Sequence, residues 1–163
     1  MAKDDKTNVM RTLEKTGIIY SCHTYEPDPT KSGEEIAATL GENPDKVFKT
    51  LVTQGKSSQY YVFVVPVKDE LDLKKAAKAA GEKSIVMIKQ KELLPLTGYV
   101  HGGCSPIGMK KAFPTFIHES CKECDHIFVS AGKVGYQIEL SPEDLIKITK
   151  SRISDIILTT DKG

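Results

Sequence analysis

Lys49 is the first candidate for a reactive side chain. If residues 47–53 form a strand, then Val47, Lys49 and Leu51 point to one face, and the ammonium group lies among apolar neighbours. Burying an ammonium group costs free energy, so a buried lysine often has a function. The alternative is a lysine near a strand end whose long side chain reaches the solvent. The spacing alone is compatible with both interpretations.

The segment Gly98–Gly108, which reads GYVHGGCSPIG, is a candidate binding loop. Its glycines allow main-chain N–H groups to approach a carbonyl group or a ribose closely. Its spacing matches neither the phosphate-binding P-loop nor the dinucleotide-binding fingerprint. A tight connection with a purely structural role is the alternative.

Cys104 lies in this loop and is a candidate nucleophile. A cysteine nucleophile needs a positioned base and surroundings that favour the thiolate. The sequence identifies no such partner, so a small cysteine packed into the loop is the favoured interpretation.

Four candidate zinc ligands occur within nine residues: His118, Cys121, Cys124 and His126. A Cys-x2-Cys pair is a recurrent element of zinc sites. Structural zinc sites usually combine two ligand pairs separated by a longer loop, however, and both histidines here adjoin predicted strands. We therefore expect a reduced cysteine pair in a turn and no cofactor, with zinc as the alternative.

Two groups of lysines could contact the phosphates of a nucleic acid. They are Lys74, Lys75, Lys78 and Lys83, and then Lys110 and Lys111. For the first group, a helix face exposed to solvent is the ordinary explanation.

The composition limits the class of protein. At 163 residues with 39% hydrophobic content, we expect one domain spanning 1–163 with a packed core. The 23 Lys and Arg residues nearly balance the 22 Asp and Glu residues, so any contact with nucleic acid must be local. No stretch resembles a secretion signal or a membrane-spanning helix. A core of this size also needs no disulfides between its four cysteines. We expect a soluble, cytoplasmic protein without disulfides.

The first half of the chain mixes predicted helices and strands. Ser32 and Glu35 have the spacing of a capping box, and Asn43 followed by Pro44 suits the start of a helical turn. The apolar run at 60–67 predicts a strand covered on both faces, central in its sheet. The predicted elements are a helix over 6–15, an extended segment over 18–25, a helix over 32–40 and strands over 47–53 and 60–67.

The second half continues this mixture around the glycine loop. Residues 131–135 have the character of a hairpin connection, and Ser141 followed by Pro142 suits a helix start. Because the strands and helices do not alternate strictly, we expect an α+β fold with a mixed, barrel-like curled sheet and helices outside it. The predicted elements are helices over 71–80, 89–94 and 141–149 and strands over 84–88, 113–118, 125–130 and 136–140.

Taken together, five ordered blocks resemble the YbaK/EbsC family of trans-editing deacylases, which is also similar to the editing domain of bacterial prolyl-tRNA synthetase. The resemblance runs from about Val9 to Ile157. It rests on Tyr25-Glu26 within HTYEPD, Val47-Phe48-Lys49-Thr50-Leu51, the stretch PVKDELDLKK at 66–75, the glycine loop with Ser105-Pro106-Ile107-Gly108, and Val129-Ser130-Ala131-Gly132-Lys133.

This resemblance implies an enzyme that hydrolyses misacylated tRNA, with cysteine on the proline tRNA as the expected substrate. It also implies that the cysteine thiol attacks its own ester, which releases a thiolactone. Lys49 matches the lysine that the family requires. The expected substrate-binding residues by the same resemblance are Tyr25, Gly102, Gly103, Ser105, Pro106, Gly108 and Ser130.

Other substrates and roles stay open at this point. Alanine on the same tRNA is one alternative substrate, and a non-catalytic tRNA-binding adaptor of the same fold is an alternative role. The resemblance also suggests prolyl-tRNA synthetase as a partner. Two departures from the family are present: Gln137 stands where close relatives often carry an acidic residue, and the segment with Cys121 and Cys124 is usually free of cysteine.

Overall fold

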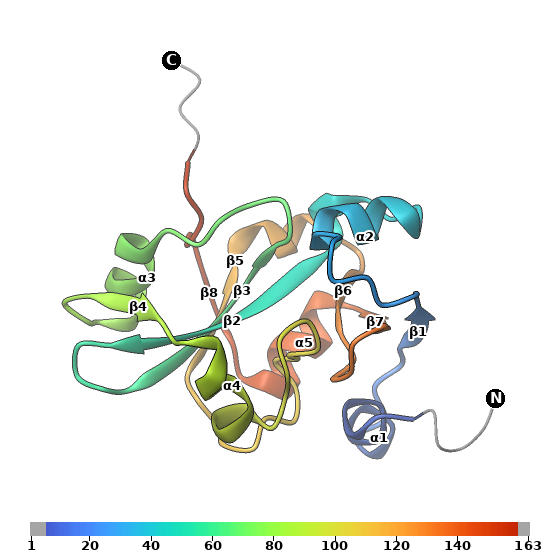
Figure 1. Ribbon diagram of the computed structural model, residues 1–163, viewed down its shortest axis with the longest axis horizontal. Helices are drawn as coiled ribbons and strands as arrows, with labels where there is room; N and C mark the ends of the chain where they lie inside the picture. The colour runs from blue at the N-terminus through green and yellow to red at the C-terminus, as the bar shows by residue number, and fades with distance from the viewer. Residues whose placement is uncertain (1–5, 160–163) are drawn as a thin grey trace.

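The computed structural model describes residues 6–159, which fold into helices packed around two β-sheets (Figure 1). Local sequence signals place several helix starts. The Thr7 side chain accepts from the Met10 N–H at the first helix, and Ser32 and Glu35 form the expected capping box. Asp72 accepts from two backbone N–H groups at the start of the third helix. The helices are α1 (Asn8–Lys15), α2 (Gly33–Thr39), α3 (Leu73–Ala80), α4 (Gln90–Thr97) and α5 (Pro142–Thr149), with 3-10 helices η2 (Pro44–Lys46) and η3 (Glu119–Glu123).

The strands divide between a three-stranded and a five-stranded sheet. The smaller sheet has the order β1-β7-β6 and is antiparallel. The larger has the order β4-β2-β3-β5-β8 and is mixed, because β5 runs parallel to both β3 and β8. The strands are β1 (Ser21–Thr24), β2 (Phe48–Gly55), β3 (Tyr60–Pro66), β4 (Ile85–Met87), β5 (Thr115–His118), β6 (Ile127–Ser130), β7 (Tyr136–Leu140) and β8 (Arg152–Ser154).

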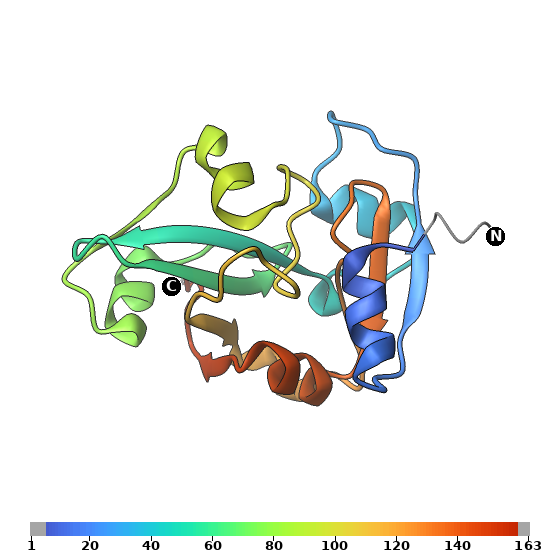
Figure 2. The same ribbon diagram turned by 90° about the horizontal axis from the view of Figure 1, so that it is seen from below.

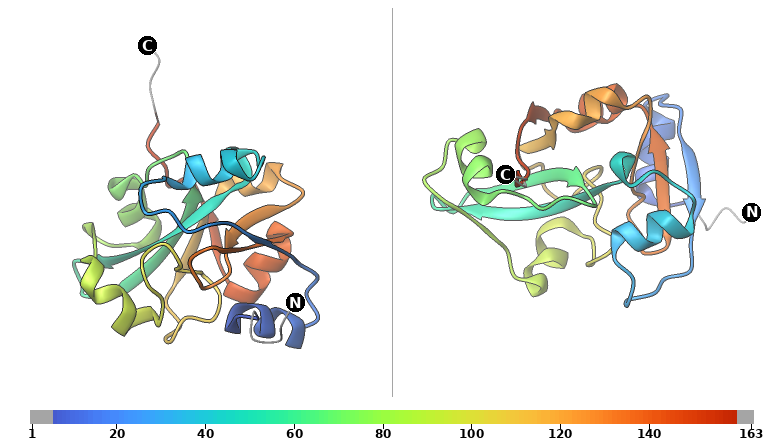
Figure 3. Two further views of the ribbon diagram at one scale, coloured as in Figure 1. Left: turned by 45° about the vertical axis from the view of Figure 1, so that its right-hand side comes forward. Right: turned by 90° about the horizontal axis from the view of Figure 1, so that it is seen from above.

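The two sheets meet where β2 begins. Val47, just before β2, forms a parallel bridge with Phe128 of β6. Helix α2 covers this junction, since Ala37 packs with Val47 and Phe128 in one small apolar cluster (Figure 3). The expected α+β fold with a mixed sheet and surrounding helices is confirmed. The strands belong to two sheets that meet at this junction.

Two larger apolar clusters hold the elements together. The first lies between the sheets, α1 and α4, and includes Leu13, Val64 and Ile138. The second lies on the other face of the large sheet under α3, and includes Phe63, Ala76 and Phe116. Figure 2 shows α3 and α4 on opposite sides of this sheet and α1 alongside the smaller one. Strand β3, buried on both faces, is central as predicted.

Two expectations about the elements were wrong. Helix α4 continues to Thr97 although Pro95 lies inside it, and the Thr97 hydroxyl donates to the Leu93 carbonyl near the helix end. Strand β8 was not predicted because its three residues are largely exposed; it forms by parallel pairing with β5 at the edge of the sheet. Among residues 6–159, no helix combines the length and apolar character needed to cross a membrane.

Candidate functional site

The smaller sheet presents one polar face. Residues opposite each other in an antiparallel pair place their side chains on the same face. Gln137 of β7 lies opposite His23 of β1 on one side and Ser130 of β6 on the other. These three side chains therefore form a row across the sheet, which we call the polar row. The other face of this sheet carries Ile127, Val129, Ile138 and Leu140, which pack into the larger core.

Lys49 joins the polar row through the junction between the sheets. Because Val47 and Phe128 are bridged in parallel, Lys49 and Ser130 each lie two residues further along and point to the same side. Lys49 is half-buried. It lies between Val47, in the cluster under α2, and Leu51, which packs against the second core. The structure thus gives Lys49 the apolar neighbours that the strand spacing indicates.

Among residues 6–159, no carboxylate pairs with the Lys49 ammonium. Within the part of the chain that the structure describes, the ion-paired lysines are Lys6, Lys68 and Lys75. An unpaired, half-buried ammonium beside a polar row is suited to attract a carbonyl oxygen or a developing negative charge.

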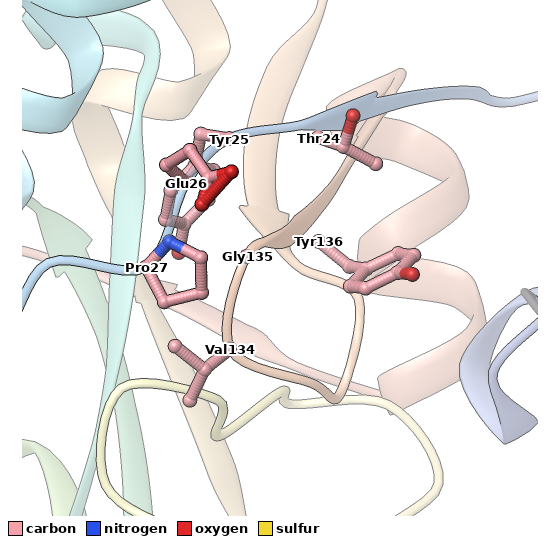
Figure 4. Close-up of a pocket in the computed structure, with 7 residues that line it drawn as sticks. All are labelled: Thr24, Tyr25, Glu26, Pro27, Val134, Gly135 and Tyr136. Atoms are coloured by element: carbon pink, nitrogen blue, oxygen red, sulfur yellow. The ribbon is translucent and has the colours of Figure 1, made fainter.

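Tyr25 extends the polar face at one end. Its N–H donates to the Gly135 carbonyl at 2.9 Å, which continues the β1–β7 pairing by one residue. Tyr25 therefore points to the same side as His23, two residues earlier. It also lines an open cleft of about 560 Å³ between the chain after β1 and the β6–β7 turn (Figure 4). The cleft is lined by Thr24, Tyr25, Glu26, Pro27, Val134, Gly135 and Tyr136, and Lys49 is not among its lining residues.

The glycine loop packs against the same turn. A Cβ atom on Gly103 would lie 3.0 Å from the Val134 nitrogen and 3.2 Å from the Lys133 carbonyl carbon, so a larger residue would force the loop and the turn slightly apart. Gly102 has a φ of +87°, a backbone conformation that favours glycine. Figure 4 shows the loop passing beside Val134. The loop backbone is thereby brought to the cleft that Tyr25 lines.

The second part of the loop lies elsewhere. Ser105 is fully buried, and its hydroxyl accepts from the Ile107 N–H within its own turn. Pro106 and Gly108 line a separate cavity of about 150 Å³ beside α5. Pro106 and Gly108 therefore line a different cavity from the one that Tyr25 lines.

Cys104 has the properties of a packing residue. It is 9% exposed, and burial raises the pKa of its thiol to about 12. The thiol is therefore neutral near pH 7, whereas a nucleophilic cysteine needs its thiolate. This agrees with the interpretation favoured by the sequence.

The Cys/His segment does not gather a ligand set. His118 is buried and its Nδ1 accepts from the Ile156 N–H at 3.4 Å, whereas His126 is exposed. Cys121 is buried in η3, and its thiol, like those of the other three cysteines, is free. Nowhere in 6–159 do three His, Cys, Asp or Glu side chains lie close enough together to hold a metal ion.

The first lysine group is divided by the structure. The Lys75 ammonium donates to Asp155, to the Ile157 carbonyl and to the Thr159 hydroxyl, so it ties α3 to the segment after β8. Lys74 and Lys78 are exposed on the same helix. Lys75 thus has a structural role, while Lys74, Lys78 and the exposed Lys83 remain available to a polyanion.

Two buried oxygen atoms, on Gln137 of the polar row and on Glu42, have no partner within the described part of the chain. Gln137 is only 6% exposed and its Oε1 has no hydrogen bond, and the same holds for the buried Oε1 of Glu42. A buried polar group without a partner costs about 1–3 kcal/mol. The sequence did not identify Glu42 as part of the site, because a charged residue between a helix end and the Asn43 cap is usually a surface residue. Only the tertiary structure brings it to Gln137.

The site as a whole favours positioning and charge stabilisation over nucleophilic attack by the protein. It combines an unpaired ammonium, hydroxyl groups and a glycine-rich backbone, and its buried thiol is kept neutral. Such groups act on a substrate that carries a polar carbonyl and brings its own nucleophile or uses water.

Comparison with known proteins yields a consistent set of relatives. Residues 27–148 match the family described as aminoacyl-tRNA editing domain. A protein of Enterococcus faecalis, EbsC, is 45% identical over 152 residues, which cover 93% of both chains; a Cys-tRNA(Pro)/Cys-tRNA(Cys) deacylase activity is proposed in its name.

Solved structures show the same fold. The crystal structure of a proposed trans-editing enzyme for prolyl-tRNA synthetase is similar with a TM-score of 0.80 and 25% identity, covering 93% of this chain and 95% of that one. The hypothetical protein APE2540 has a TM-score of 0.84 at 22% identity, covering 93% and 100% of the two chains. The arrangement of sheets around the site is therefore shared over nearly the whole chain.

Proposed function

The chain belongs to the aminoacyl-tRNA editing domain family, and from this membership and the site geometry we propose that it is a trans-editing deacylase for Cys-tRNA(Pro). The proposal of deacylation is supported by EbsC, whose name proposes this activity and which is similar over 93% of its length. Cysteine fits a site that offers positioning groups and no activated nucleophile, since this amino acid carries its own thiol.

The observation that supports the proposal most is the bridge between Val47 and Phe128, because Lys49 and Ser130 each lie two residues beyond it and so share one side of the junction. Tyr25 points to the same side as His23, which is also the side of Ser130. An ammonium and hydroxyl groups on one face can bind the ester carbonyl and the ribose of a charged tRNA end. Gly102 and Gly103 bring the loop backbone to the turn that borders the Tyr25 cleft, and the Gly103 N–H is itself bonded to the Val100 carbonyl.

In the proposed reaction the substrate supplies the nucleophile. The cysteine thiol loses its proton and its sulfur bonds to the ester carbonyl carbon, while the carbon–oxygen bond to the ribose breaks. The ribose oxygen takes up a proton, and the products are uncharged tRNA and a thiolactone. Lys49 and the loop N–H groups stabilise the negative charge that develops on the carbonyl oxygen. Tyr25 and Ser130 orient the ribose and the carbonyl group.

The test is a panel of charged tRNAs: Cys-tRNA(Pro), Cys-tRNA(Cys), Ala-tRNA(Pro) and Pro-tRNA(Pro). We expect rapid loss of cysteine from the proline tRNA, appearance of the thiolactone and little loss of proline. Faster loss of alanine than of cysteine would reassign the substrate. Binding of tRNA without any deacylation would show a non-catalytic adaptor.

Prolyl-tRNA synthetase is the proposed partner, because a similar solved structure is described as a trans-editing enzyme for that synthetase. Repeating the panel with the synthetase present measures this contribution. Selectivity for the proline tRNA should rise when the synthetase is added, and unchanged selectivity would show that the deacylase selects its tRNA alone.

A further inference from the structure

Two buried oxygen atoms, one in the polar row and one next to it, have no hydrogen-bond partner within residues 6–159. Gln137, the middle residue of the row, is more than nine-tenths buried and its Oε1 has no donor. Ser130 lies beside it on β6, and Lys49 follows across the junction. The Gln137 amide oxygen is therefore a buried acceptor next to Ser130 in the polar row.

Glu42 brings a carboxylate to the same point. It follows the end of α2, where its N–H donates to the Ala37 carbonyl, and its side chain approaches the Gln137 amide. Its Oε1 is buried and unpartnered as well. Burial, as the larger effect, raises the pKa of Glu42, and the Gln137 amide and His23 oppose this shift.

The nearby charges do not satisfy Glu42. The other titratable groups that act on it are His23 on β1 and Glu139 on β7. These two bind each other, with His23 Nε2 2.9 Å from Glu139 Oε1. One nitrogen of this imidazole, Nε2, is thus bound to a carboxylate other than Glu42.

From these contacts we infer that Glu42 and Gln137 form the subsite for the α-ammonium group of the aminoacyl ester. This inference rests on the proposed function. A group that donates several hydrogen bonds and carries positive charge would satisfy both oxygen atoms, and the α-ammonium does both. In the substrate it is attached to the carbon next to the ester carbonyl, so it lies close to the carbonyl oxygen that Lys49 attracts. Glu42 is thereby a specificity residue that selects a free amino group.

The inference distinguishes two kinds of substrate, charged tRNA with a free amino group and charged tRNA whose amino group is acylated. The experiment compares Cys-tRNA(Pro) with N-acetyl-Cys-tRNA(Pro), each rate being divided by that of the uncatalysed reaction. The wild-type protein should prefer the free amine at least about tenfold in kcat/KM, equivalent to about 1.4 kcal/mol.

The key variant is Glu42→Gln, which keeps the shape of the side chain and removes its charge. It should lose most of the preference for the free amine and leave the rate on the N-acetyl substrate unchanged. Gln137→Leu should reduce the preference in the same way. Glu34→Gln, which alters an exposed carboxylate on α2, is the matched control and should retain the full preference.

If Glu42→Gln slows both substrates equally, its role is structural and the inference is overturned. An undiminished preference in both variants overturns it too, and indicates that the amino group is bound elsewhere. If wild-type protein deacylates neither substrate, the proposed function itself fails.

Discussion

Val47 and Phe128 are bridged in parallel, and this single contact places Lys49 and Ser130 on the same side of the junction between the two sheets. The two residues are 81 positions apart in the chain (130 minus 49) and belong to different sheets. A family motif identifies each of them, but only the bridge explains how they could act on one substrate.

Replacing Lys49 by methionine should abolish most of the activity. The change keeps the aliphatic stem between Val47 and Leu51 but removes the ammonium, and loss of one preorganised charge-stabilising group costs about 100-fold or more in kcat. Single-turnover deacylation of Cys-tRNA(Pro) measures this. Since the ammonium has no carboxylate partner in 6–159, the melting temperature should not fall, and a variant that is inactive because it is unfolded would contradict the proposed role.

Gly103→Ala should impair the site by moving the loop. The added Cβ would lie 3.0 Å from the Val134 backbone nitrogen, so loop and turn must separate, with a destabilisation of about 1–3 kcal/mol. Activity should fall with it. Gly81→Ala is the control: Gly81 has a positive φ, so the change strains the backbone, but its Cβ position is open and it lies at the C-terminal end of α3. Equal activity in the two variants would show that the loop does not serve the reaction.

Cys104→Ala should retain most of the activity. The pKa of this thiol is raised to about 12 by burial, so the thiolate is scarce from pH 7 to 9 and no thiolate titration should appear in the pH–rate profile. The lost packing should cost about 1 kcal/mol of stability or more. A loss of activity as large as that of Lys49→Met would instead identify Cys104 as a participant in the chemistry.

Glu42→Gln should stabilise the fold, and increasingly so as the pH rises. The folded protein raises the pKa of Glu42 above 4.5, so the native state retains a proton that the unfolded chain has released. Stability of the wild-type protein therefore falls as pH rises through the window between the unfolded and folded pKa values. Denaturant titrations at several pH values measure the difference between the two proteins. A difference that shrinks with rising pH would mean that Glu42 is stabilised as a carboxylate in the absence of substrate.

Lys75→Met should destabilise the protein, whereas Lys74→Met should not. The Lys75 ammonium bonds to Asp155, the Ile157 carbonyl and Thr159, and hydrogen bonds to charged groups contribute about 1.5–3 kcal/mol, reduced here by partial exposure. Lys74 is exposed and its loss should cost less than about 0.5 kcal/mol. Chemical denaturation of the two variants tests this. Equal stabilities would show that the C-terminal contacts contribute nothing.

The sequence by itself determined the local features of this protein. Caps such as Ser32 with Glu35, the apolar run that became β3 and the alternation around Lys49 act over a few residues, so spacing predicts them. The motifs likewise identified the family, because the order of blocks along the chain is a property of the sequence. The neutral state of Cys104 could be anticipated from the lack of a base nearby in the chain.

Only the tertiary structure decided which of these residues meet. It separated Pro106 and Gly108 from the Tyr25 cleft, assigned Lys75 to a structural role, and brought Glu42 to Gln137. Such contacts depend on how two sheets and a helix end pack together, and no short-range pattern encodes that geometry. The unpartnered oxygen atoms beside Ser130 arise from this packing, because burial and the lack of a donor are properties of the folded chain alone.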